Sequence, residues 1–151
     1  MATLSSETLH ATTVAIAGRA VMICGVSGSG KSDLALRLID RGATLVSDDY
    51  TLAKRTGRGA TAHLVAAAPQ NIAGKMEIRG IGIVDMAYMA DIPVALIVDL
   101  FDIVDRMPEK PLTRSIAGVD VPVMKIVPRE PSAPLKVEYA LRAFGLDVVG
   151  A

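Results

Sequence analysis

The sequence predicts an α/β domain whose sheet is mixed and partly antiparallel. Short apolar runs of the strand type are numerous along the chain, whereas only two segments show clear helical periodicity. A doubly wound parallel sheet alternates strands and helices one for one, which this pattern does not do. A glycine-rich loop also joins an apolar strand to the first helical segment. That arrangement is typical of a phosphate-binding loop in an α/β fold.

Composition sets the broad class of the protein. The chain has 151 residues, of which 51% are hydrophobic and 21% charged, and this balance excludes intrinsic disorder. The formal net charge is zero, so no general basic field attracts nucleic acid or an acidic membrane surface. The single cysteine, Cys24, fits a reducing compartment. We expect one cytoplasmic domain over residues 1–151 with a flexible arm at residues 1–9 and with no nucleic-acid or membrane partner.

The first half of the chain predicts hairpins around one helix. Two pairs of short runs flank glycine-containing turns and are expected as hairpins, namely residues 12–17 with 19–24 and residues 50–54 with 60–65. Leu34 and Leu38 recur at helical spacing after Gly30, and Gly42 ends this helix. Residues 43–47 predict a buried strand.

The second half predicts a central strand and a closing helix. Residues 94–100 are almost entirely apolar, as in a strand that is buried on both faces. Residues 102–111 contain two prolines and five charges and predict an exposed, mobile loop. The remaining expected elements are strands at 76–79, 113–116 and 121–127 and a helix at 132–144.

Residues 25–32 read GVSGSGKS and match the pattern G-x-x-x-x-G-K-[ST]. The residues expected to bind a nucleotide are Gly25, Val26, Ser27, Gly28, Ser29, Gly30, Lys31 and Ser32. Glycines allow successive N–H groups to point inward, and the following helix contributes its positive N-terminus. In such loops the lysine reaches the β- and γ-phosphates of ATP and the serine hydroxyl binds Mg²⁺.

Two acidic segments are candidates to complete such a site. Asp48 and Asp49 end the buried strand at 43–47, whereas Asp99 lies in the central strand. Adjacent carboxylates repel each other unless a cation lies between them, and they are also candidates for accepting a proton. Glu77 and Arg79 are two residues apart on an expected strand, so they face the same side and suggest a metal and phosphate subsite.

Three segments carry a resemblance to a known family. The sequences GVSGSGKSDLAL, LIDRGATLVSDDY and MEIRGIGIVD, in this order and spacing, resemble the catalytic domain of bacterial HPr kinase/phosphorylase. The resemblance runs from about residue 10 to about residue 106 and more loosely to residue 145, and EIRGIGI is its most specific part. The family's larger members carry an extra N-terminal domain, so we expect the short form that lacks it.

The resemblance implies a P-loop fold related to phosphoenolpyruvate carboxykinase, a homo-oligomer that in the family is usually a hexamer, and a specific reaction. An Mg²⁺-dependent enzyme would transfer the γ-phosphate of ATP to a seryl hydroxyl of HPr, the phosphocarrier of the sugar phosphotransferase system. His10 matches an active-site histidine of the family, although Ala11 replaces the usual glycine. Ser32 and Glu77 match metal ligands, Asp48 and Asp49 match the acid/base pair, and Arg106 matches a catalytic arginine.

Within that reading, Asp49 is the preferred base, and Lys31, Arg79 and Arg106 would offset the charge of the transferring phosphoryl group. The family's late Pro-x-x-x-Gly-Arg loop, which is tied to dephosphorylation, is replaced by Pro128, Arg129 and Glu130. Since Glu130 adds negative charge there, we expect weak phosphate-dependent dephosphorylation. Two alternatives remain, a P-loop kinase of small metabolites and a nucleotide-binding regulator without catalytic activity.

Overall fold

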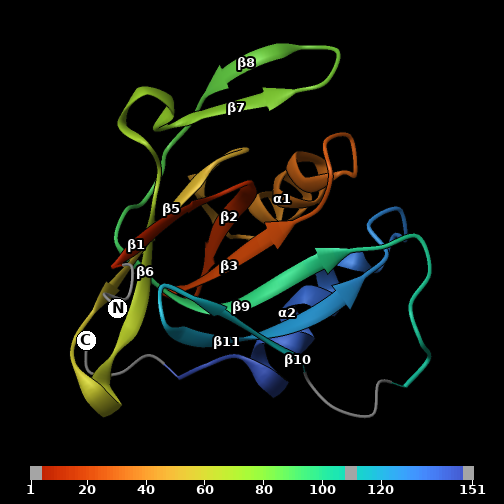
Figure 1. Ribbon diagram of the computed structural model, residues 1–151. Helices are drawn as coiled ribbons and strands as arrows, with labels where there is room; N and C mark the ends of the chain where they lie inside the picture. The colour runs from red at the N-terminus through yellow and green to blue at the C-terminus, as the bar shows by residue number, and fades with distance from the viewer. Residues whose placement is uncertain (1–4, 108–111, 148–151) are drawn as a thin grey trace.

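The computed structural model describes residues 5–107 and 112–147 (Figure 1). Within these residues, nine strands form one curled sheet. They are β1 (Ser6–Leu9), β2 (Ala11–Ile16), β3 (Arg19–Cys24), β4 (Thr44–Ser47), β5 (Thr51–Thr56), β6 (His63–Ala67), β9 (Ile92–Leu100), β10 (Leu112–Ile116) and β11 (Val119–Ile126). The order of neighbouring strands is β1, β5, β6, β9, β3, β2 and β4; in addition, β11 pairs with β9, and β10 pairs with β11.

The other elements cover or extend this sheet. Strands β7 (Lys75–Ile78) and β8 (Gly82–Asp85) form a separate antiparallel hairpin, which projects from the body at the top of Figure 1. The helices are α1 (Lys31–Asp40), α2 (Ala133–Phe144) and two short 3-10 turns at Gly59–Thr61 and Gln70–Ile72. Neither α-helix of the described chain is long and apolar enough to cross a bilayer.

Strand β9 lies at the centre of the sheet and makes it mixed. It pairs in parallel with β3 and with β11, and its first residues, Ile92 and Pro93, pair antiparallel with β6. Strands β6 and β11 therefore share one edge of β9, at opposite ends. This arrangement confirms both the central strand and the mixed sheet that the sequence predicts.

The sheet has an apolar core on each face. Side chains alternate along β3, so that Val21 and Ile23 belong to one core and Ala20 and Met22 to the other. The first core contains residues of α1 and α2, such as Leu38 and Leu141. The curled strands close over the second core. Both helices thus cover the same face, and the phosphate loop connects that face to the central strands.

The predicted hairpins and helices are confirmed, with ends that differ by a few residues. The turn between β2 and β3 and the turn between β10 and β11 both consist of alanine and glycine with positive φ, at 51° and 81° for Ala17 and Gly18. Two consecutive residues with positive φ are the signature of a type I′ turn.

The expectation of a flexible arm at residues 1–9 is wrong for the residues of this segment that the structure describes. Residues 6–9 form β1, which pairs antiparallel with β5. The carboxylate of Glu7 also accepts a hydrogen bond from the backbone N–H of Ala117, at 2.5 Å. Residues 1–4 of that arm, and residues 108–111 of the expected mobile loop, lie outside the described residues.

Candidate functional site

The phosphate loop follows β3 and leads directly into α1. Gly28 and Gly30 have positive φ, at 80° and 103°, and Gly30 caps the N-terminus of α1. The N–H of Ser29 donates to the carbonyl oxygen of Val26 at 3.0 Å. A Cβ atom at Gly25 would lie only 2.5 Å from the Ser29 hydroxyl oxygen. A side chain at position 25 would therefore crowd the tight path of this loop, which favours glycine there.

The ammonium group of Lys31 lies across the loop. Its Nζ donates to the carbonyl oxygens of Gly25 and Val26 at 3.0 and 3.1 Å, and the residue is only 6% exposed. Carbonyl oxygens are neutral acceptors, whereas phosphate oxygens carry negative charge and therefore attract an ammonium group more strongly. Phosphate oxygens entering the loop would therefore compete well for this group.

A cavity of about 590 Å³ opens beside the loop. This volume lies within the range of small-molecule sites. Its walls are Ser27, Gly28, Ser29, Gly30, Lys31, Ser32, Asp33, Leu36, Arg37, Asp48, Asp49, Glu77, Ile78, Arg79, Pro128 and Arg129. They come from the phosphate loop, α1, the end of β4, the β7–β8 hairpin and the segment after β11. The structure thus brings together, at one cavity, most of the residues that the sequence singles out.

Asp48 joins three elements of the site. Its Oδ1 accepts hydrogen bonds from the Ser32 hydroxyl at 2.6 Å and from the Thr12 hydroxyl at 3.1 Å. Its Oδ2 accepts one from the backbone N–H of Glu77 at 3.0 Å. The residue is 7% exposed. Three donors therefore hold this carboxylate between α1, β2 and β7.

Asp49 is placed differently from its neighbour. Its φ is 69°, which is uncommon for a residue other than glycine, and its side chain has a different partner from that of Asp48. Its backbone N–H donates to the Thr12 hydroxyl at 3.1 Å, and its Oδ1 lies 2.7 Å from Nε2 of His10. The His10 ring stacks on Tyr50 with centroids 5.1 Å apart. Asp49 is therefore an exposed carboxylate that is oriented by one histidine.

Glu77 and Arg79 both line the cavity, but they do not share a strand face as expected. Strand β7 ends at Ile78, and Arg79 begins the turn toward β8. The alternative carboxylate, Asp99, is bound by Arg114 through contacts of 3.2 and 2.5 Å and is not part of the cavity wall. Asp48 and Asp49, and not Asp99, are thus the carboxylates beside the phosphate loop.

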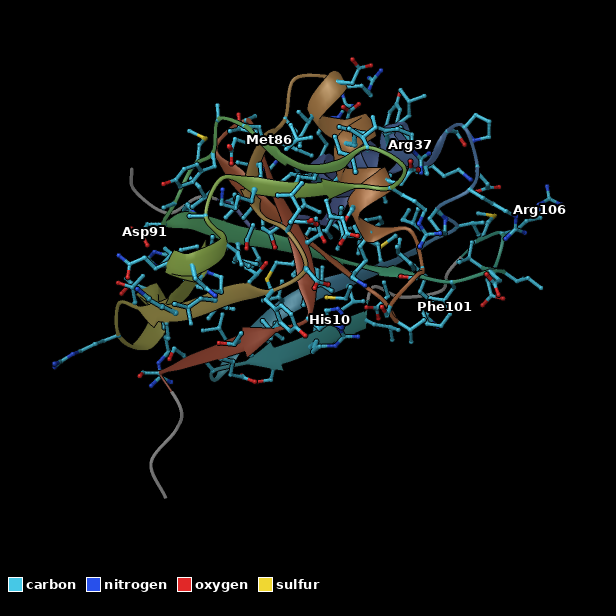
Figure 2. All side chains as sticks on the ribbon, turned by 90° about the horizontal axis from the view of Figure 1, so that it is seen from above. His10, Arg37, Met86, Asp91, Phe101 and Arg106 are labelled. Carbon is cyan, nitrogen blue, oxygen red and sulfur yellow. The ribbon has the colours of Figure 1, made fainter. Side chains whose placement is uncertain are left out.

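The structure does not bring Arg106 to this cavity. Arg106 lines a second, more apolar cavity of about 930 Å³ between the segment after β9, β11 and α2. In Figure 2, Arg106 lies at the right-hand edge of the molecule, whereas His10 lies near the centre. Within a single chain, the arginines of the phosphate cavity are Arg37, Arg79 and Arg129.

Two contributors to the site are not apparent from the sequence. Thr12 connects Asp48 and Asp49 through its hydroxyl, yet it reads only as a β-branched strand residue. Arg37 lines the cavity and pairs with Asp33 at 3.1 Å. The i, i+4 spacing of Asp33 and Arg37 after a phosphate loop is the signal that could have indicated a shared face.

The sequence predicts that the carboxylate of Glu130 faces the phosphate cavity, and this placement is wrong. Its carboxylate lies 2.7 Å from the ammonium of Lys136 and is not part of the cavity wall. Arg129 is the charged residue of this segment that faces the cavity. The segment after β11 therefore adds positive rather than negative charge to the site.

Cys24, at the end of β3, is a protonated thiol. Burial raises its pKa from 9.0 to about 11, and the negative charge of Asp99 acts in the same direction. Arg114 and Lys31 oppose this shift. A thiol with such a pKa is a weak nucleophile near neutral pH.

The fold and the cavity define an α/β protein with a glycine-rich phosphate loop between a central strand and a helix. Residues 2–145 match the family model described as the HPr Serine kinase C-terminal domain, so the chain belongs to this family. It is 38% identical over 136 residues to the HPr kinase/phosphorylase of Limosilactobacillus reuteri, covering 80% of this chain and 40% of that protein. It is 37% identical over 156 residues to that of an Exiguobacterium species, covering 94% and 49%.

A solved structure agrees with this assignment. The HPr(Ser) kinase/phosphatase of Coxiella burnetii superposes with a TM-score of 0.71 at 32% identity, covering 90% of this chain and 88% of that one. The chain spans about two fifths to one half of the length of these curated relatives.

Proposed function

We propose that this chain is the catalytic domain of a protein kinase that transfers the γ-phosphate of ATP to a seryl hydroxyl of HPr. The observation that carries the proposal is the link between Ser32 and Asp48, at 2.6 Å. It places the hydroxyl of the phosphate loop against a carboxylate from a different strand. The similarity to proteins named HPr kinase/phosphorylase supports the choice of kinase and of HPr.

The donor set fits Mg²⁺. Ser32, Asp48, Asp49 and Glu77 present only oxygen atoms, which this cation prefers. Within residues 5–107 and 112–147, no group of three or more His, Cys, Asp or Glu side chains could hold a metal by itself. Mg²⁺ in nucleotide sites commonly uses one or two carboxylates and completes its shell with phosphates and water. We assign Ser32 and Glu77 to hold it, and its chemistry there would be charge neutralisation on the phosphates.

The two aspartates have different proposed roles. Asp48 is buried and accepts hydrogen bonds from Ser32 and from the backbone N–H of Glu77, so this residue orients Ser32 and the β7–β8 hairpin. Asp49 is exposed, with a side chain 56% accessible, and His10 holds only one of its oxygens. Its other oxygen is available to accept the proton of an incoming hydroxyl. His10 is thus a positioning residue for the base.

The cations of the cavity would stabilise the charge of the transferring group. Lys31 would exchange its two carbonyl acceptors for phosphate oxygens when ATP binds. Arg79 would approach from the β7–β8 hairpin. Preorganised donors of this kind usually give the largest single contribution to phosphoryl transfer.

The reverse reaction, in which inorganic phosphate removes the phosphoryl group from seryl-phosphorylated HPr, would use the same carboxylates. Glu130 lies outside the cavity wall and its carboxylate is 2.7 Å from the ammonium of Lys136, which reduces the expected charge repulsion toward phosphate. We therefore infer that nothing in the charge of this segment opposes the reverse reaction, which a pyrophosphate-release assay measures directly.

The test is transfer of label from [γ-³²P]ATP to HPr in the presence of Mg²⁺. Wild type should label HPr on serine, and Lys31→Ala should lose at least about 1,000-fold in rate, because positioning and charge stabilisation provide nearly all of the catalysis. Lys54→Ala, at an exposed position on β5, is the matched control and should keep the wild-type rate. If HPr stays unlabelled and a small metabolite becomes labelled instead, the result favours a metabolite kinase. If ATP binds but no label is transferred, the result favours a nucleotide-binding regulator.

A further inference from the structure

Arg37 makes contacts that the proposed catalytic roles do not use. It lies on α1 and faces the segment after β11 (Figure 2). Its Nη2 donates to the carbonyl oxygen of Pro128 at 2.5 Å, and its Nη1 donates to that of Glu130 at 3.2 Å. One guanidinium group therefore binds both of the carbonyls that flank Arg129.

This segment is held close to the phosphate loop. A Cβ atom built on Gly30 would lie 3.5 Å from Cβ of Pro128, which is ordinary van der Waals contact. Arg129 is the next residue and lines the same cavity as Lys31. Among the residues that the structure describes, its ion-pair partner is the carboxylate of Asp102, at 3.9 Å, and both side chains of this pair are largely exposed. Such pairs contribute little, so the Arg129 guanidinium is available to an anion.

The placement of Arg37 also carries a cost in stability. Its Nε is buried and has no hydrogen-bond partner among the described residues. A buried N–H without a partner lowers the free energy of unfolding. The planar fork of arginine can bind two carbonyls at once, which the single ammonium of a lysine cannot do with the same geometry. The two carbonyl contacts therefore hold the segment in place despite this cost.

We propose that Arg37 is a positioning residue that holds Arg129 at the phosphate cavity, where Arg129 donates hydrogen bonds to phosphate oxygens of the bound nucleotide. The inference rests on the proposed function, since it takes the cavity to be the ATP site. The charge of the site supports it. Four carboxylates line the cavity, from Asp33, Asp48, Asp49 and Glu77, so a polyanionic ligand needs cations beyond Lys31 and the metal.

The test is a double-mutant cycle on ATP binding, measured by calorimetry with Mg²⁺ present. Arg37→Gln and Arg129→Gln should each raise the Kd for ATP about tenfold, as expected for loss of a hydrogen bond to a charged group. The double variant should also show about tenfold, and not the product of the two changes, because Arg37 acts only through Arg129. A purely structural role for Arg37 would not produce this dependence on Arg129.

Arg41→Gln is the matched control. Arg41 also ties α1 to another element, through contacts of 2.7 to 3.1 Å with Glu138 of α2, but it does not line the cavity. It should lower thermal stability without changing the Kd. If Arg37→Gln does not fold, Arg37→Lys takes its place with the same expected direction, because an ammonium lacks the planar fork with which the guanidinium binds the carbonyls on either side of Arg129.

Three results would overturn the inference: a Kd within twofold of wild type for the Arg37 variant, the same for Arg129→Gln, or a double variant that loses about a hundredfold. Lys31→Ala separates this failure from that of the proposed function. If Lys31→Ala loses ATP binding while the Arg37 variant does not, only the positioning role is wrong. If Lys31→Ala binds ATP as wild type does, the assignment of the cavity itself is wrong.

Discussion

At the scale of single residues, the site separates two adjacent carboxylates by backbone geometry. The positive φ of Asp49 sends its side chain toward His10, while Asp48 remains buried between Ser32 and Thr12. Left-handed backbone at a residue other than glycine costs free energy and is concentrated at functional sites. The two neighbouring aspartates thus have different surroundings, which suits the different roles proposed for them.

Substitution should separate the two roles. Asp49→Asn should lower kcat by about 100- to 10,000-fold, the usual contribution of a general base, and should leave the Kd for ATP within about threefold. Asp48→Asn should instead weaken ATP binding and lower the melting temperature, because three hydrogen bonds depend on it. Steady-state kinetics together with calorimetry measure both effects. If Asp48→Asn lowered kcat alone and Asp49→Asn weakened ATP binding and stability, Asp48 would be the base and Asp49 the orienting residue.

The Cys24 thiol provides a pH-dependent observable. At pH 8, a thiol of pKa 11 has about 0.1% thiolate, so alkylation should be about 100-fold slower than for a thiol of pKa 9. The pH dependence of the alkylation rate should give an apparent pKa near 11. The pKa of Cys24 is higher in the folded state than in the unfolded state. The protonated thiol therefore makes its full contribution to the free energy of unfolding below pH 9, and this contribution is lost as the pH rises toward 11.

Asp99→Asn tests the electrostatic part of this shift. It removes a charge that raises the pKa of Cys24, so the alkylation profile should move to lower pH. An unchanged profile would assign the whole shift to burial.

At the scale of elements, the β7–β8 hairpin is joined to the body at few points. Met76 packs in the core that α1 shares, and the N–H of Glu77 binds Asp48. At the base of the hairpin, Gly74 contacts the ring of Tyr88 so closely that a Cβ atom would lie 2.8 Å from it. This contact fixes the direction in which the hairpin leaves the sheet.

Gly74→Ala should therefore disturb both stability and ATP binding. The added methyl group forces the half-exposed Tyr88 ring to move, a cost that adds to the strain of a positive φ. Gly18→Ala is the control, since Gly18 has a similar φ, 81° against 72°, with nothing within 4 Å of the added atom. Urea unfolding should show the larger loss for Gly74→Ala, and only this variant should raise the Kd for ATP. Equal losses would show that the contact is not the cause.

The elements that the sequence predicts well are those with an apolar pattern. The central strand β9, the helices and the hairpin of β2 and β3 all bury alternating or continuous apolar residues. Strands β1 and β8 have no buried residue, so no pattern distinguishes them from loops. They form because a neighbouring strand supplies hydrogen bonds, in β5 and β7 respectively. That information lies outside the segments themselves.

At the scale of the whole molecule, the site is assembled from distant parts of the chain. The phosphate loop and the aspartate pair could be predicted because each is a local motif at the end of a strand. The contributions of Thr12, Arg37 and Arg129 depend on how β2, α1 and the segment after β11 meet in space. The position of Arg106, away from the cavity, depends likewise on the path of the chain after β9.

Ligand binding should consequently stabilise the entire fold. ATP at 100 times its Kd should add about 2.7 kcal/mol by mass action, which for a chain of this size raises the melting temperature by roughly 5–10 °C. Differential scanning calorimetry with and without ATP and Mg²⁺ measures this shift. Lys31→Ala should abolish it. A shift that persists in this variant would locate ATP elsewhere.

The parallel pairing of β3 with β9 has a consequence for biosynthesis. Strand β3 ends at Cys24, but its partner β9 begins only at Ile92, and β11 follows later still. While the chain is being made, β3 and the loop after it have an unpaired edge until β9 leaves the ribosome. Long-range pairing of this kind slows folding, and an open strand edge invites association with other chains. We expect the nascent protein to depend on chaperones most strongly before residue 100 has emerged.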